Sequence, residues 1–255
     1  MYSNNVRKIK EENNLIKLDV IDGTIKKKEV KYNKDGTVRK VANNKIAGES
    51  SEVYAFKTIE EINMMIKYFD KQIQESANNE QEKIARRNKM LFIIGINVGI
   101  RGSDLCKLTW NKLLHSDMSF RDYIKIKPKK TEKKDKYVLL GFNEAVKIAV
   151  KEYIKKYPVE NINDYVFKSR KGDDAISRMS IGRIIKQAAK EIGIKQNVNS
   201  HSLRKTWGYH VYHKTKDIAM LQKCFGHSSQ LITMKYIGLY DEDIIETYNS
   251  VSLGI

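Results

Sequence analysis

Cysteine, proline and long apolar runs are all scarce in this sequence. Its 255 residues include two cysteines and two prolines. Cys106 and Cys224 stand far apart and belong to no paired metal-ligand motif, which predicts small buried side chains in a reducing compartment. Neither an internal repeat nor a proline-rich linker is present. The sequence therefore gives no sign of a disulfide framework, a cysteine-held metal or a repeat architecture.

The longest apolar run covers residues 90–100 and ends at Arg101. Because it is too short to span a bilayer, it predicts a buried core helix and no membrane partner. The amino-terminal segment lacks the apolar stretch of a secretory signal. We therefore expect a cytoplasmic protein.

Positive charge, by contrast, is abundant. Lys and Arg number 48 against 31 Asp and Glu, which gives a formal net charge of +17. Such an excess favours a polyanionic partner, either nucleic acid or an acidic membrane surface. A basic but merely solvated protein is the alternative, because lysine is common throughout the chain. A chain of this length can hold one large domain, or one domain and an appendage.

The character of the sequence changes near residue 55. Residues 1–55 are polar and lysine-rich, with alternating stretches separated by the hairpin turn signals Asp22-Gly23 and Asp35-Gly36. We interpret them as a basic N-terminal extension that forms a β-ribbon. A disordered arm is the alternative, because few large apolar residues are available for burial. Residues 56–240 have mainly helical patterns and form the principal domain, and residues 241–255 form a C-terminal tail.

Capping residues mark the helices of the principal domain. Thr58 and Glu61 form a capping box at the start of one helix. Gly99 is placed as the carboxyl cap of a second, apolar helix that ends near Val98. Asn143 caps another helix. Further helices are predicted over residues 178–192, 201–213, 217–225 and 229–237.

A basic hairpin interrupts these helices. Residues 123–127 and 136–140 each have the composition of a strand, and the turn between them is rich in lysine. A short apolar piece, residues 165–167, is a candidate third strand. The predicted fold is mainly α with a small antiparallel β-sheet, an α+β class.

His201 and Arg204 lie three residues apart at the start of a predicted helix, so their side chains point the same way. An imidazole for proton transfer, a guanidinium for phosphate oxygens and free amides at the helix amino end would form an oxyanion site. The same spacing is common on ordinary solvated helices. His210 and His213 follow on this helix without a carboxylate or cysteine at suitable spacing, so packing is predicted there and no metal site.

The segment Gly226-His227-Ser228-Ser229 predicts a turn between two short helices, and Tyr236 follows on the second of them. Alone, a tyrosine at that position of an amphipathic helix predicts core packing. A histidine in a turn alone predicts capping or solvent exposure. These residues acquire a functional meaning only from their order and spacing relative to other sites.

Five separated sites stand in a fixed order along the principal domain: Gly99-Ile100-Arg101-Gly102-Ser103-Asp104-Leu105, the hairpin pair Lys130-Thr131, His201 with Arg204, the turn with His227, and Tyr236. Together they resemble the phage integrase family of tyrosine recombinases over about residues 56–239. The resemblance implies the tyrosine recombinase catalytic-domain fold. It also implies a site-specific DNA recombinase that performs integration, excision or inversion.

The resemblance assigns the central chemistry to four residues. Arg101 and Arg204 hold the non-bridging oxygens of the scissile phosphate, where two fixed arginines stabilise the transition state more than the ground-state diester. Tyr236 attacks phosphorus and forms a 3′-phosphotyrosyl intermediate. His201 helps to remove the proton of the phenol.

Three further roles are implied by the resemblance. His227 donates a hydrogen bond to a phosphate oxygen, and Asp104 holds an arginine or the His201 helix in register; a surface carboxylate is the alternative for Asp104. Lys130, chosen for its Lys-Thr pair, supplies a proton to the departing 5′ oxygen. The lysines expected to contact DNA are Lys127, Lys129, Lys133, Lys134 and Lys205.

Double-stranded DNA is the partner that the resemblance implies, with a nucleoid-associated location. One active site cuts one strand, so exchange between two duplexes implies a homo-tetramer on DNA, with residues 241–255 as the candidate for a protomer-swapped helix. The phosphotyrosyl link retains the phosphoester energy, so neither a cofactor nor a metal ion is expected. Most relatives place a helical domain ahead of the catalytic one, where this sequence has residues 1–55, and this difference leaves the reaction outcome open.

Two rival interpretations use the same features. Residues 217–237 are arranged as helix, glycine turn and helix, which is typical of a non-catalytic helix-turn-helix DNA-binding regulator. That hypothesis explains the charge but leaves the concurrence of the five motifs to chance. The second rival is a type IB topoisomerase, which nicks and reseals one duplex. The compact size and the turn before Tyr236 favour a recombinase.

Overall fold

The computed structural model describes residues 10–11, 14–21, 24–29, 53–127, 137–170, 172–239 and 248–252, the first three ranges by their backbone alone. The chain divides into two compact units, Met1–Ser50 and Ser51–Ile255. In the first unit, β1 (Lys10–Glu11), β2 (Asn14–Ile21) and β3 (Thr24–Glu29) form an antiparallel sheet in that order. Ile21 pairs with Thr24. The turns predicted at Asp22-Gly23 and Asp35-Gly36 both lie outside the described residues.

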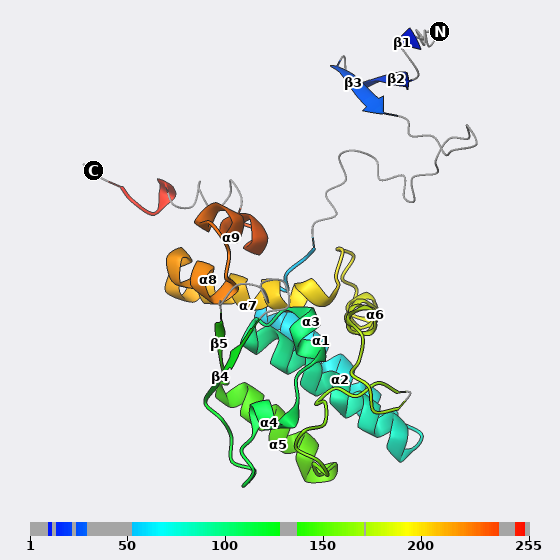
Figure 1. Ribbon diagram of the computed structural model, residues 1–255, viewed down its shortest axis with the longest axis vertical. Helices are drawn as coiled ribbons and strands as arrows, with labels where there is room; N and C mark the ends of the chain where they lie inside the picture. The colour runs from blue at the N-terminus through cyan, green and yellow to red at the C-terminus, as the bar shows by residue number, and fades with distance from the viewer. Residues whose placement is uncertain are drawn as a thin grey trace. The chain divides into compact units, whose positions relative to one another are not determined.

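The described part of the second unit is built from helices and one β-hairpin (Figure 1). In chain order its elements are α1 (Ile59–Gln74), α2 (Asn79–Val98), α3 (Gly102–Cys106), α4 (Trp110–Leu113), β4 (Tyr123–Ile126), β5 (Val138–Gly141), α5 (Glu144–Lys156), α6 (Arg178–Glu191), α7 (Ser200–Thr215), α8 (Ile218–Phe225) and α9 (Gln230–Ile237). This architecture confirms the predicted class, mainly α with a small antiparallel sheet.

Local capping chemistry fixes the ends of the helices that carry the predicted site. Thr58 and Glu61 complete the capping box of α1. α2 ends at Gly99 with φ of 64°, and α8 ends at Gly226 with φ of 62°, a left-handed conformation that costs glycine little. A Cβ on Gly99 would also come within 2.3 Å of the Trp207 ring. These two glycines set the direction in which the chain enters the predicted motifs.

α2 is the central helix and packs against α1, α5 and α7. Its Leu91, Phe92 and Ile94 are fully buried in the main apolar core. A second, smaller apolar cluster contains Leu221, Phe225 and Ile237 and joins α8 and α9 to α7. In Figure 1, α7, α8 and α9 gather at one end of this unit, and α4 and α5 lie at the other. The position of α9, which carries the predicted nucleophile, therefore depends on packing in the smaller cluster.

Residues 165–167 do not join the hairpin, so that prediction was wrong. Tyr165 forms a bridge with Thr109, and the Phe167 carbonyl oxygen accepts a hydrogen bond from the Ile176 amide at 2.8 Å. Within the described residues β4 and β5 form a two-stranded sheet. An apolar triplet indicates burial, but it does not specify which backbone it pairs with.

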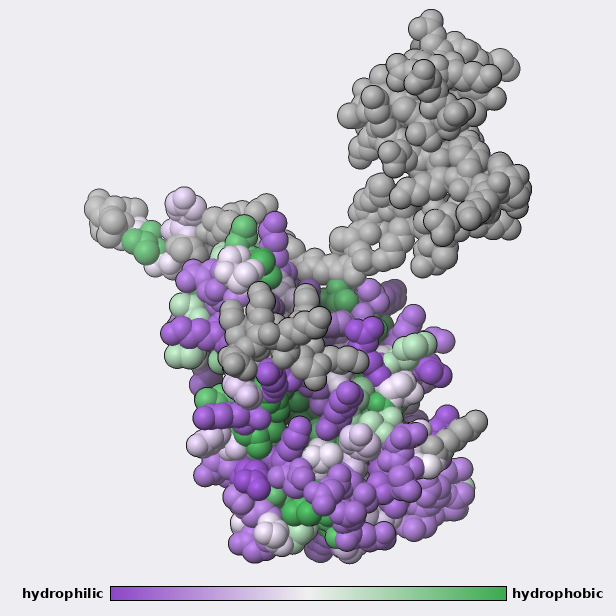
Figure 2. All heavy atoms as spheres, viewed as in Figure 1, coloured by the Kyte–Doolittle hydropathy of each residue, from purple (hydrophilic) through white to green (hydrophobic). Residues whose placement is uncertain are grey.

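The face of the second unit in Figure 2 is largely hydrophilic, with apolar side chains confined to small patches among charged ones. No helix in the described ranges combines the length and the apolar character needed to cross a bilayer. On α9, Leu231 is 59% exposed and Ile232 is 47% exposed. The small cluster therefore covers only one side of this helix.

Candidate active site

Arg101 and Arg204 meet at the end of α8. Arg204 in α7 donates from Nη1 to the Gly99 carbonyl oxygen at 2.6 Å and from Nη2 to the Phe225 carbonyl oxygen at 2.8 Å. Arg101, the N-cap residue of α3, donates from Nη2 to the same Phe225 oxygen at 3.1 Å. Among the described residues neither guanidinium forms an ion pair with a carboxylate. Two adjacent cations that share one neutral acceptor are suited to hold an anion.

Arg204 is an almost completely buried charge, 4% exposed. Burial lowers the pKa of its guanidinium to about 10, partly opposed by the neighbouring Tyr236. The Phe225 ring lies beneath it, with 4.2 Å between the guanidinium carbon and the ring centroid. Its two carbonyl acceptors offset part of the cost of burial. A lysine could not reproduce this planar arrangement of donors.

Tyr236 lies on α9 and is half-buried, with its ring against those of Phe225 and His227. Its ring centroid is 5.3 Å from that of Phe225 and 5.2 Å from that of His227. Burial raises the pKa of the Tyr236 phenol, whereas the charges of Arg204 and Arg101 and a hydrogen bond with Arg204 lower it. The phenol thus retains its proton at neutral pH, but any phenolate that forms lies beside two cations.

His201 occupies the first turn of α7, on the same helix as Arg204. Burial lowers the pKa of the His201 imidazole, and the charges of Arg178, Arg204, Arg101 and Lys205 lower it further. A histidine with a lowered pKa is neutral at neutral pH and can accept a proton.

Two amides at the start of α7, those of His201 and Ser202, are not free, so the prediction of free amides was wrong for these two. The Asn199 side-chain oxygen accepts a hydrogen bond from the His201 amide at 2.8 Å, and the Asn199 carbonyl oxygen accepts one from the Ser202 amide at 3.0 Å. An N-cap asparagine satisfies amides that would otherwise face a ligand. At these two positions the side chains, and not the amides, are available to an anion.

His227 follows the αL residue Gly226 and is fixed by the helix that carries Tyr236. Its Nδ1 lies 3.0 Å from the Thr233 hydroxyl oxygen, and the tautomer decides which of the two donates. Thr233 is completely buried. This hydrogen bond links the imidazole to α9.

Two other predicted residues lie close to this group. Asp104 in α3 is half-buried; its charge acts on Arg204, and its Oδ2 is buried without a hydrogen-bond partner among the described residues. Lys205, expected to contact DNA, is 6% exposed, and its Nζ lies 5.8 Å from the centroid of the Tyr236 ring. The DNA contact of Lys205 stays a prediction. The sequence analysis did not predict that Lys205 lies beside the Tyr236 ring.

The structure describes only one of the lysines predicted to act in the hairpin. Lys127 is exposed after β4, with its Nζ 5.9 Å from the Tyr137 ring centroid. Four others lie outside the described residues: Lys129, Lys130, Lys133 and Lys134. The role of Lys130 as the acid therefore stays a prediction.

Arg178 is a residue that the sequence reasoning missed. It is exposed at the first position of α6, and a Cβ placed on Gly102 would lie 3.4 Å from the Arg178 Cγ. Its charge is the strongest charge influence on the pKa of His201, after burial. A cation in the first turn of a helix interacts unfavourably with the helix dipole. This unfavourable position was the sequence feature that could have pointed to a functional role for Arg178.

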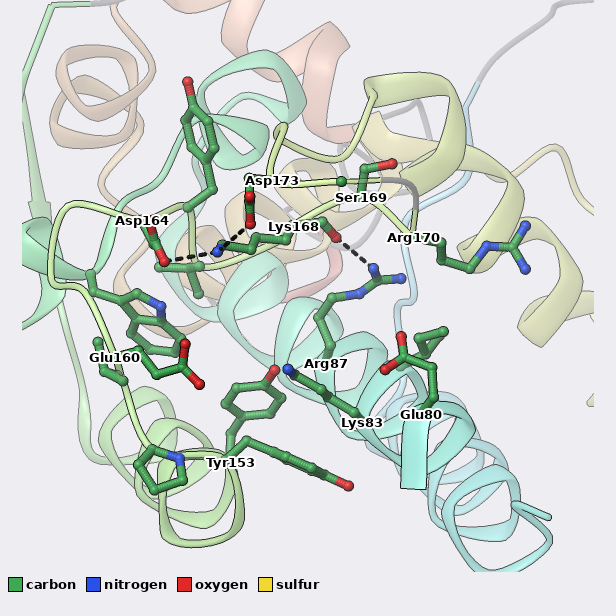
Figure 3. Close-up of a pocket in the computed structure, with 18 residues that line it drawn as sticks. Glu80, Lys83, Arg87, Tyr153, Glu160, Asp164, Lys168, Ser169, Arg170 and Asp173 are labelled. Carbon is green, nitrogen blue, oxygen red and sulfur yellow. Dashed lines mark hydrogen bonds and ion pairs between the residues drawn. The ribbon is translucent and has the colours of Figure 1, made fainter. Parts of the chain in front are cut away.

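A cavity of about 390 Å³ lies elsewhere, between α2, α5 and residues 158–173, and is lined by none of the predicted catalytic residues (Figure 3). Arg87 donates to the Lys168 carbonyl oxygen at 2.6 Å, while the Lys168 ammonium pairs with Asp164 and Asp173 at 2.8 Å each. The Lys168 ammonium is thus paired with carboxylates of its own loop, and the Arg87 hydrogen bond joins α2 to that loop.

The other histidines of α7 pack as the sequence predicted. His210 Nε2 lies 2.9 Å from the Phe56 carbonyl oxygen, and the His213 ring centroid is 4.2 Å from that of Tyr209. Among the described residues, no three His, Cys, Asp or Glu side chains come together in a way that could hold a metal ion.

Comparison with known proteins identifies the family. Residues 57–243 match the Phage integrase family. The chain is 41% identical over 170 residues to the probable integrase/recombinase YoeC of Bacillus subtilis (strain 168), covering 67% of this chain and 87% of YoeC. It is 27% identical over 180 residues to the tyrosine recombinase XerC of Thermodesulfovibrio yellowstonii, covering 68% of this chain and 57% of XerC.

Its fold is similar to that of the XerH site-specific recombinase bound to a palindromic difH substrate in a post-cleavage complex. The TM-score is 0.58 at 23% identity, over 80% of this chain and 55% of XerH. The chain thus spans most of YoeC but little more than half of XerC and XerH. The matched residues include every described element from α1 to α9. This chain belongs to the phage integrase family of tyrosine recombinases.

Proposed function

We propose that this chain is a site-specific DNA recombinase that cuts and rejoins strands through a covalent bond to Tyr236. The observation that carries the proposal is the meeting of two arginines, a histidine and a half-buried tyrosine from three parts of the chain. Arg101 follows α2, Arg204 and His201 belong to α7, and Tyr236 belongs to α9. Such a group can bind a phosphodiester and attack it.

In the cleavage step the Tyr236 oxygen forms a bond to phosphorus, and the bond from phosphorus to the 5′ oxygen breaks. His201 accepts the phenol proton, and Lys130 supplies the proton with which the 5′ oxygen leaves as a hydroxyl. Arg101 and Arg204 stabilise the extra negative charge on the equatorial oxygens.

The rest of the cycle is the reverse of this step. His227 donates a hydrogen bond to one of the phosphate oxygens, and Asp104 holds the arginine group in place. Attack by the 5′ hydroxyl of a partner duplex restores a phosphodiester and frees Tyr236. The covalent link keeps the phosphoester energy, so the exchange consumes no nucleotide cofactor.

The proposed partner is double-stranded DNA. The net charge of +17 and the similarity to XerH, which was solved bound to its difH substrate, support this choice. Since one active site cuts one strand, exchange between two duplexes needs four copies of the chain, with residues 241–255 as the segment that packs into a neighbour. A DNA partner also supports a nucleoid-associated location.

Trapping the covalent intermediate tests the proposal. Full-length protein is incubated with a random-sequence library of nicked duplexes, from which the short fragment that carries the freed 5′ hydroxyl can dissociate after cleavage. Protein-linked DNA is recovered in SDS and sequenced, which also yields a substrate. Tyr236→Phe is compared with wild type and with Tyr212→Phe, which changes another tyrosine of the same small cluster.

We expect adducts from wild type and Tyr212→Phe and none from Tyr236→Phe. DNA binding without an adduct from any variant would favour the helix-turn-helix regulator. An adduct that survives Tyr236→Phe would assign the nucleophile to another residue. Joined products from two duplexes distinguish a recombinase from a topoisomerase, which reseals one.

A further inference from the structure

Lys205 is a buried cation that the proposed chemistry leaves without a role. It is 6% exposed and lies in α7 directly after Arg204. Its Nζ is 5.8 Å from the centroid of the Tyr236 ring. Removing an ammonium group from water is costly unless nearby groups compensate for the lost solvation. The Tyr236 ring is one of the groups that contact this ammonium group.

Charged and titratable groups face Tyr236 from each element that packs around it. α7 contributes Arg204 and Lys205, the connection from α2 to α3 contributes Arg101, and the turn between α8 and α9 contributes His227. Arg204 acts on the phenol group itself, since its charge and a hydrogen bond lower the pKa of Tyr236. The Lys205 Nζ lies over the aromatic ring.

The attraction between a cation and an aromatic ring depends on the electron density of the ring. A neutral phenol attracts an ammonium group moderately, and a phenolate attracts it more strongly because the negative charge spreads into the ring. A cation at the ring therefore favours the charged form of Tyr236 over the neutral form. This is differential stabilisation of the kind that accelerates a reaction.

We propose that Lys205 is a positioning residue for the nucleophile: its ammonium group holds the Tyr236 ring and stabilises the negative charge that develops on the ring as the phenol attacks. The inference rests on the proposed function, since it requires Tyr236 to be the nucleophile. In this role Lys205 transfers no proton. It is therefore distinct from Lys130, which protonates the 5′ oxygen.

The test measures single-turnover cleavage of the recovered substrate against pH, with Lys205→Met and Lys205→Arg. Methionine removes the charge and keeps an unbranched chain, whereas arginine keeps the charge. The matched control is Lys216→Met. Lys216 follows the same helix, and its Nζ lies 5.4 Å from the centroid of the Tyr212 ring, but it is exposed and not beside Tyr236.

We expect Lys205→Met to cleave about tenfold more slowly than wild type near pH 7, equivalent to a shift of roughly one pKa unit in the phenol. The deficit should shrink as the pH rises, because a more ionised phenol needs less help. Lys205→Arg and Lys216→Met should follow the wild-type profile. A deficit of equal size at every pH, or an arginine variant that behaves like methionine, would overturn the inference.

A second substrate separates this role from acid catalysis. Replacing the bridging 5′ oxygen by sulfur gives a leaving group that needs no proton. Lys205→Met should keep its deficit on this substrate, and erasure of the deficit would identify Lys205 as the acid. If wild type forms no adduct, the proposed function fails; if wild type cleaves and Lys205→Met parallels it, only this inference fails.

Discussion

Arg101, Arg178 and Arg204 lie near the proposed phosphate position. They differ in the groups that they contact in the absence of DNA. Arg101 and Arg204 donate to backbone carbonyl oxygens. Arg178 is exposed, and within the described ranges no hydrogen bond or ion pair holds its guanidinium. The neighbouring charges that act on His201 are all positive. An arriving phosphate would relieve this repulsion, which makes Arg178 a candidate for direct phosphate contact.

Removal of Arg178 should therefore weaken cleavage through one particular phosphate. We expect Arg178→Ala to slow single-turnover cleavage roughly tenfold, since a hydrogen bond to a charged group contributes about 1.5–3 kcal/mol. Substrates that carry a neutral methylphosphonate at single positions identify the contact. At the contacted phosphate, the substitution should slow wild type but leave Arg178→Ala unaffected. Arg183→Ala, an exposed arginine on the same helix, is the control and should retain every methylphosphonate penalty.

At the scale of elements, the position of Tyr236 depends on how closely α7 approaches α8 and α9. Gly208 in α7 permits this approach, because a Cβ there would lie 2.5 Å from the Phe225 Cζ and 2.8 Å from the Ile237 Cγ2. The Phe225 carbonyl oxygen also receives both arginines. A displacement of α8 would thus move the phenol and the arginine group together.

Gly208→Ala should lower both stability and cleavage. Overpacking of a filled core costs about 1–3 kcal/mol, which urea unfolding would detect, and adduct formation should fall further than stability alone explains. Gly182→Ala is the matched control, since a Cβ there meets the Ser200 amide nitrogen at an ordinary 3.7 Å. An alanine variant at Gly208 with wild-type unfolding and adduct yield would show that the contact is not limiting.

The ends of the elements could be predicted from sequence because capping is local: Thr58 begins α1, and Gly99 and Gly226 end α2 and α8. Which distant segments pair with each other in the fold could not be predicted from sequence. The pairing of Tyr165 with Thr109 depends on tertiary structure that an apolar triplet does not encode.

The candidate site shows the same division. The order of its motifs along the chain could be predicted through resemblance. The shared Phe225 carbonyl oxygen, the burial of Lys205 and the approach of Arg178 could not, because they arise from the packing of α6, α7 and α8. Each depends on contacts between residues far apart in sequence.

At the scale of the whole molecule, both units are basic. Residues 1–50 contain 12 Lys and Arg against 7 Asp and Glu, and the rest of the chain contains 36 against 24. β3 has three consecutive lysines, Lys26, Lys27 and Lys28. Lysines that neutralise phosphates release counterions, so their contribution to DNA binding depends on salt. The first unit is thus a candidate for a DNA-gripping arm.

Replacing these three lysines by glutamine in the full chain should weaken DNA binding and flatten its salt dependence. Each lost phosphate contact lowers the slope of log affinity against log salt by about 0.9, so a loss of up to about 2.7 is expected in a salt titration of equilibrium binding. Covalent cleavage at saturating DNA should stay at the wild-type rate, because the active-site residues are unchanged.

The control must separate contacts made by β3 from a mere loss of net charge. A second triple glutamine variant removes the same charge from exposed lysines of the other unit: Lys67, Lys71 and Lys190. If the first unit grips DNA, this second variant should keep the wild-type salt slope. Equal flattening by both variants would show that net charge alone governs affinity, and the arm would then have no specific part in binding.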